Sequence, residues 1–126
     1  MAHVLLSTKV LVLATGGRLE PVLGKIAEEN GWSILEVETL PQAVKHIQFN
    51  MPRMFIVQVT EPVSRALQLT STLRSHLPHV PLLAVALCDD HNIELSVRRT
   101  GAYYYFPDLA DPDRLAQLVE ALLKQP

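Results

Sequence analysis

Short apolar runs alternate along the chain with longer segments in which apolar residues recur every three or four positions. Runs of the first kind are typical of strands, and segments of the second kind are typical of amphipathic helices. The predicted strands are 9–14, 32–39, 54–59, 81–87 and 102–106. The predicted helices are 18–30, 40–49, 63–77, 91–99 and 112–123. This alternation predicts an α/β fold in which helices cover both faces of a parallel sheet.

The run 54–59 contains a single polar residue, Gln58, and predicts a central strand that is buried on both faces. Such a strand delivers Gln58 to the carboxyl edge of the sheet, where open α/β folds place their sites. By contrast, 32–39 mixes glutamate with apolar residues, which favours a position near the sheet edge. In the segment 91–99 we expect Ile93, Leu95 and Val97 to point inward.

The 126 residues fit one domain, 1–126, in which residues 1–8 form an amino-terminal extension. A formal charge of −2 without a basic stripe argues against direct nucleic-acid binding. The single cysteine, Cys88, suits a reducing compartment. No segment reads as a signal peptide or as a membrane-spanning helix, so we expect a cytoplasmic protein without membrane contact.

Three local features give the chain a resemblance to a known family. Gln58 is followed four positions later by Pro62, Pro81 begins the fourth strand, and Gly101-Ala102 leads into Tyr105. Together with the order of the elements, these features resemble the receiver domain of bacterial response regulators, the CheY-like signalling module of two-component systems. The resemblance implies a flavodoxin-like, doubly wound (βα)5 fold with strand order 2-1-3-4-5.

The resemblance also implies where phosphorylation chemistry would lie. A receiver uses an aspartate nucleophile after strand three, an acidic pair that holds Mg²⁺ after strand one, a hydroxyl after strand four and a lysine after strand five. These positions fall on Gln58, on Ala14 and Thr15, on Ala86 and on Asp108. A carboxamide cannot form an acyl phosphate, and two uncharged side chains offer little to a divalent cation. The sequence therefore predicts a degenerate pseudo-receiver that is not an enzyme and has no metal or cofactor.

The aromatic position of the family is retained as Tyr105. In the family this residue swings inward when the hydroxyl of strand four moves toward the phosphoryl group. Ala86 stands in place of that hydroxyl and leaves more room beneath the ring. We therefore expect Tyr105 to hold one rotamer independently of any signal.

The leading functional hypothesis is a non-catalytic module that binds a partner protein or a second copy of itself. Its expected docking face comprises the fourth helix, the fifth strand and the fifth helix. Charged and aromatic residues mix there, as they do in interfaces. The residues are Arg98, Arg99, Tyr103, Tyr104, Asp108, Asp111 and Arg114. Such a domain is expected at the amino terminus of a larger regulator, for example of transcription.

Two alternatives stay open. A small-ligand or cofactor sensor would use the crevice between strands one and three, at Thr15, Gly16, Gln58 and Thr60. A receiver with an unusual phosphoryl acceptor is the other alternative. The histidines and aspartates near 76–79 and 89–91 are better explained as turn and capping residues than as metal ligands.

Overall fold

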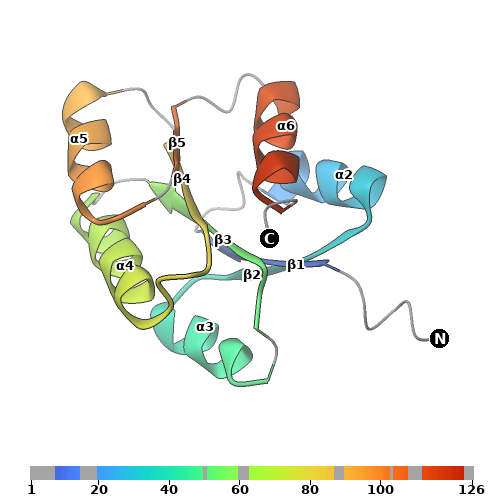
Figure 1. The fold of residues 1–126 in the computed structure, drawn as a ribbon, viewed down its shortest axis with the longest axis horizontal. Coiled ribbons are helices and arrows are strands. Elements are labelled where there is room, and N and C mark those ends of the chain that lie inside the picture. Colours follow the sequence, from blue (N-terminus) through green and yellow to red (C-terminus); the bar gives the residue numbers. More distant parts are fainter. Residues whose placement is uncertain are drawn as a thin grey trace.

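The computed structural model of the protein describes residues 8–14, 20–49, 51–59, 63–86, 90–102, 104–107 and 112–123. The strands are β1 (Thr8–Leu13), β2 (Trp32–Val37), β3 (Met54–Val59), β4 (Leu82–Ala86) and β5 (Tyr104–Phe106). The helices are α2 (Glu20–Asn30), α3 (Leu40–Ile47), α4 (Val63–His76), α5 (His91–Arg99) and α6 (Pro112–Leu123). Strands and helices alternate along the chain, as predicted (Figure 1).

All five strands are parallel and lie in the order β2-β1-β3-β4-β5. The predicted fold class and strand order are confirmed. The order reverses direction between β1 and β3, and parallel α/β sheets bind their ligands outside the carboxyl ends of the strands at such a switch point. Among the described strands, β2 and β5 form the two edges of the sheet.

Apolar residues from alternate strand positions form two cores, one on each face of the sheet. One core includes Phe55 and Val57 of β3 and packs under α3, α4 and α5. The other includes Met54 and Ile56 and packs under α2 and α6. Figure 1 shows these two groups of helices on opposite sides of the sheet. Every residue of β3 and β4 is buried, which explains why both strands have almost no polar residues.

The predicted strand 32–39 is too long at its carboxyl end, because its last residues cap the next helix. Thr39 is the N-cap of α3, and its hydroxyl accepts a hydrogen bond from the Gln42 amide at 3.3 Å. The Gln42 side chain in turn accepts hydrogen bonds from the amides of Glu38 and Thr39. This capping box satisfies donors that would otherwise be left open at the start of the helix.

Leu95 does not point inward as predicted, because it lies on the outer side of α5. Ile93 and Val97 are four residues apart and share the inner face, whereas Leu95 falls between them and is 40% exposed. On α3, Ala43 is buried while its neighbour Val44 is 46% exposed for the same reason.

The helix α5 has a defined beginning and end. Asp90 is its N-cap, and Oδ1 of Asp90 accepts hydrogen bonds from the amides of Asn92 at 2.8 Å and Ile93 at 3.4 Å. Gly101, with a φ of +94°, follows the helix and redirects the chain toward β5. No helix in the described part of the chain is long and apolar enough to cross a membrane.

Candidate functional site

Gln58 lies near the carboxyl end of β3, beside the switch point of the sheet. Its neighbour Val57 is paired with Leu13 of β1, and Gln58 itself is paired with Val85 of β4. The side chain of Gln58 is 5% exposed, and its Nε2 atom is buried. Gln58 takes part in an interaction within the chain. The polar residue predicted for this edge is therefore present, but as a nearly buried amide.

Two alanines lie at the same carboxyl edge of the sheet as Gln58. Ala14 directly follows β1, is 5% exposed, and donates its amide to the Val37 carbonyl at 3.0 Å. Ala86 ends β4, pairs with Val59 and is 1% exposed. Methyl groups at these positions can neither ligate a cation nor donate a hydrogen bond to a phosphoryl oxygen. None of the side chains of Gln58, Ala14 and Ala86 is a carboxylate, the group to which a phosphoryl group is transferred in an acyl phosphate.

Several predicted site residues lie outside the described residues. They are Thr15, Gly16, Thr60, Tyr103, Asp108 and Asp111. Of the proposed ligand crevice, only Gln58 is described, so the small-ligand alternative stays a prediction. Among the described residues, no group of three His, Cys, Asp or Glu side chains is arranged to hold a metal ion. Asp90 acts as a helix cap, as the sequence suggested.

Tyr105 is buried in β5, on the face of the sheet that packs against α4 and α5. The side chain is 8% exposed and belongs to the same core as Ala86. The Tyr105 hydroxyl oxygen is buried, and the residue has an interaction partner within the chain. The ring therefore fills the core in an inward position.

The predicted docking face is built from α5, β5 and α6, and we call it the α5–β5–α6 face. The edge strand β5 lies between the two helices in Figure 1. Tyr104 is 38% exposed and faces outward from β5. Arg98, Arg99 and Arg114 are exposed, and Arg98 forms a 2.8 Å salt bridge with Glu94. Sequence reasoning missed the exposed Leu95, which an explicit helical projection of 91–99 would have found.

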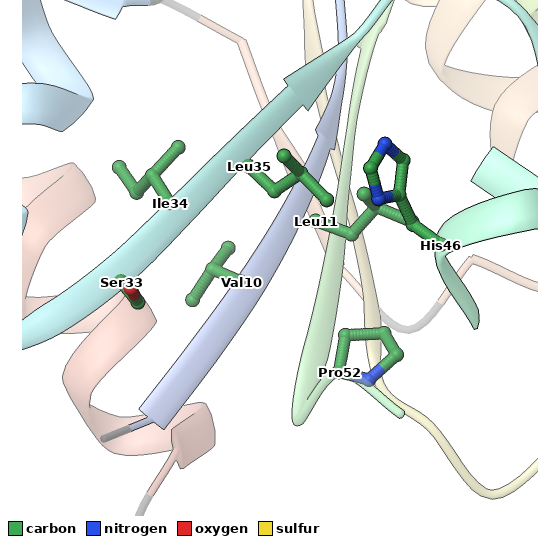
Figure 2. Close-up of a pocket in the computed structure, with 7 residues that line it drawn as sticks. All are labelled: Val10, Leu11, Ser33, Ile34, Leu35, His46 and Pro52. Atoms are coloured by element: carbon green, nitrogen blue, oxygen red, sulfur yellow. The ribbon is translucent and has the colours of Figure 1, made fainter. Parts of the chain in front are cut away.

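Further exposed apolar residues lie outside the α5–β5–α6 face and were not predicted. Leu35, Val44, Phe49 and Met51 are 39%, 46%, 77% and 52% exposed. Leu35 also lines a pocket of about 270 Å³ formed by residues of β1, β2 and α3 together with Pro52. In Figure 2, Leu35 and Leu11 lie between the strands and His46 of α3, with Pro52 at the lower end. The alternation of residues in 32–37 was the available signal for this surface.

Comparison with known proteins gives no match at the level of sequence but many in structure. No family profile matches the chain, and a search of curated proteins finds no match. A response regulator from Thermotoga maritima superposes with a TM-score of 0.83 at 16% identity, over 94% of this chain and 99% of that one. The orphan response regulator HP1043 of H. pylori gives 0.78 at 18% identity, over 94% and 98%.

The receiver domain of NtrX from Brucella abortus gives a TM-score of 0.76 at 21% identity, over 94% of this chain and 99% of that domain. At such sequence identities, structural similarity shows how the backbone is arranged and does not show what particular side chains do. The five parallel strands in the order 2-1-3-4-5 agree with it. The chain therefore has the CheY-like fold of response regulator receiver domains.

Proposed function

We propose that this chain is a pseudo-receiver, a receiver-like signalling module that does not accept a phosphoryl group and acts by binding protein. The observation that carries the proposal is the set of side chains at the carboxyl edge of the central strands. Gln58, Ala14 and Ala86 occupy the positions where the resemblance places a nucleophilic carboxylate, an acidic ligand and a hydroxyl. All three are buried and uncharged. An amide is not a nucleophile toward phosphorus under physiological conditions, so the signal must be transmitted in another way.

The α5–β5–α6 face supports the second half of the proposal. Tyr104 and Leu95 expose apolar area there, and Arg98, Arg99 and Arg114 are exposed on the two helices. Tyrosine and arginine are both enriched in protein interfaces. The partner on this face is a second copy of the chain or a different protein.

The phosphorylation half is tested by incubating the protein with acetyl phosphate and Mg²⁺ and measuring its intact mass. A phosphorylatable receiver domain in the same reaction confirms that the reagent is active. We expect the receiver to gain a phosphoryl group and this chain to keep its mass. A phosphoryl adduct on this chain that is hydrolysed at alkaline pH, as acyl phosphates are, would overturn this half of the proposal.

The binding half is tested by sedimentation velocity over a range of protein concentrations. If the face joins two copies, Tyr104→Ser and Leu95→Ser raise the dissociation constant, because each removes apolar area that dimerisation buries. Gln68→Ser, on the exposed side of α4, serves as the matched control. A dimer that is insensitive to both substitutions would place its interface elsewhere and would contradict the proposal. A chain that stays monomeric would exclude the second copy as the partner.

A further inference from the structure

The edge of the sheet opposite the α5–β5–α6 face has an open strand. β2 pairs with β1, and no described strand lies on its outer side. An unpaired edge presents backbone donors and acceptors that an extended peptide can use. Whether an edge can accept a strand depends on where its free groups point and on what its side chains offer.

The direction of the backbone groups follows from one hydrogen bond. The Ala14 amide donates to the Val37 carbonyl at 3.0 Å, so the backbone groups of Val37 point toward β1. Backbone groups alternate in direction along a strand, so Leu35 also points toward β1 while Ile34 and Glu36 point to the open edge. Beyond them, the Glu38 amide is already satisfied by Gln42. The open segment of the edge is therefore centred on Ile34 and Glu36.

The side of β2 that faces α2 carries an acidic groove with an aromatic floor. Trp32 and Ile34 line it from β2, and carboxylates approach from Glu28 of α2 and from Glu36 and Glu38. Glu28 and Glu38 are exposed, whereas Glu36 already takes part in an interaction within the chain. A carboxylate rim beside a tryptophan ring binds a cationic side chain through charge attraction and through cation–π contact.

The side of β2 that faces α3 carries the polar Ser33 and the apolar Leu35 and Val37. Leu35 is 39% exposed there, next to the pocket formed with Leu11, His46 and Pro52 (Figure 2). Successive side chains of β2 thus meet an acidic groove on one face and, on the other, a mainly apolar pocket that also includes Ser33 and His46. A strand laid along β2 would point its own side chains alternately to the same two faces.

We propose that the outer edge of β2 binds an extended segment of a partner protein in which basic and apolar residues alternate. The segment forms backbone hydrogen bonds with Ile34 and Glu36. Its basic side chains enter the groove between α2 and β2, and its apolar side chains cover Leu35. This surface is separate from the α5–β5–α6 face, so the inference does not depend on the function proposed for that face.

Charge distinguishes this occupant from a second copy of the chain. Antiparallel pairing of two β2 strands brings the carboxylates of both copies to the same face of a continuous sheet, which is unfavourable. The groove is lined by Glu28, Glu36 and Glu38, and its described lining includes no lysine or arginine. A basic segment is attracted to the exposed carboxylates of Glu28 and Glu38, whereas a second copy of this edge is repelled by them.

The experiment uses a synthetic octapeptide of alternating valine and arginine with blocked ends. Trp32 is the only tryptophan of the chain and lines the groove, so its fluorescence reports binding there. We expect a saturable change with this peptide. We expect none with an octapeptide that alternates valine and glutamate, and weaker binding by one that carries four valines followed by four arginines, because that peptide has the charge without the alternation.

Amide hydrogen exchange tests the pairing residue by residue. On peptide binding, the Ile34 and Glu36 amides are expected to gain protection, while the Leu35 amide, which points toward β1, stays unchanged. Glu28→Gln together with Glu38→Gln is expected to weaken binding at low salt by roughly two- to thirtyfold, the range for two exposed charge pairs. Glu29→Gln with Asp113→Asn changes the net charge equally at exposed positions outside the groove and serves as the control.

Four results would overturn the proposal. The first is a Trp32 fluorescence that does not change when the alternating valine–arginine peptide is added, and the second is an equal affinity for the peptide with four valines followed by four arginines. The third is peptide binding without protection of the Ile34 and Glu36 amides, and the fourth is an equal loss of affinity in the groove variant and in the control variant. Protection of the same two amides by raising the protein concentration alone would show that a second copy occupies the edge.

Discussion

At the residue scale, the neutrality of Gln58 is matched to its burial. The side chain is 5% exposed, and the alanines on both neighbouring strands offer no hydrogen bond from their side chains. A carboxylate in an apolar site has its pKa raised, because burial penalises the charged form. Restoring the aspartate of a receiver at this one position would therefore introduce a cost without restoring the function.

We predict that Gln58→Asp makes the stability of the protein depend on pH. Burial raises the pKa of the introduced carboxyl group in the folded state above its unfolded value of about 4. The variant is therefore most stable below about pH 4, where the carboxyl group is protonated in both states. It loses roughly 1–4 kcal/mol as the pH rises toward 7 and the carboxyl group ionises in the unfolded state. Urea denaturation across this pH range measures the effect. Gln58→Leu is the matched control, since it cannot titrate; equal pH profiles for the two variants would contradict the prediction.

Tyr105 provides a second test at this scale. We predict that its ring keeps one inward rotamer, because it fills the core beside Ala86 and the edge lacks the groups that would move it. Side-chain coupling constants measured by NMR should show a single χ1 value, with and without beryllofluoride and Mg²⁺. Two populated rotamers, or a change on adding the phosphoryl analogue, would contradict this prediction.

At the scale of elements, α5 depends on its first residue. Asp90 accepts hydrogen bonds from two amides of the first turn, and α5 carries Leu95, Arg98 and Arg99 of the docking face. We predict that Asp90→Ala lowers the free energy of unfolding by about 1 kcal/mol, whereas Asp90→Asn keeps most of it, because asparagine is an equally good N-cap. Thermal denaturation of the two variants measures the difference. If they were equally destabilised, the negative charge rather than the cap would be responsible.

The sequence was sufficient to predict the order of the elements, because each strand is a compact apolar run bounded by turn residues. It also placed Gln58, Ala14 and Ala86 at one edge, since parallel strands end on the same side. Element ends were less accurate. Thr39 belongs to a helix cap that is formed by hydrogen bonds with Gln42. The pattern of apolar residues contains no information about these hydrogen bonds.

The sequence pattern also failed to predict which apolar residues of short helices are exposed. Leu95 and Val44 are apolar and adjacent to core positions, yet they lie on the outer surface. A helix of eight or nine residues has only a few positions that face the core. One additional apolar residue on its outer side therefore hardly changes the helical periodicity of its apolar residues. Leu35 of β2 was indicated by the alternation in 32–37, whereas the pocket that it lines with α3 emerged only from the structure.

At the scale of the whole molecule, the two proposed interfaces occupy opposite edges of one sheet. β2 and β5 are separated by three strands, so they lie roughly 19 Å apart at the usual spacing of neighbouring strands. The intervening strands β3 and β4 are buried throughout and closely packed. Coupling between the edges would require an element with two alternative arrangements. In receivers the phosphorylation site moves such an element, and under the proposed function Gln58, Ala14 and Ala86 replace the groups of that site.

We therefore predict that the two edges bind independently. Glu28→Gln with Glu38→Gln should leave self-association through the α5–β5–α6 face unchanged, and Tyr104→Ser should change the affinity of the alternating valine–arginine peptide by less than about twofold. Peptide titrations of wild-type and Tyr104→Ser protein, followed by Trp32 fluorescence, provide the measurement. A larger change in affinity would mean that the sheet or a helix has a second packing state. In that case, binding at one edge would regulate binding at the other.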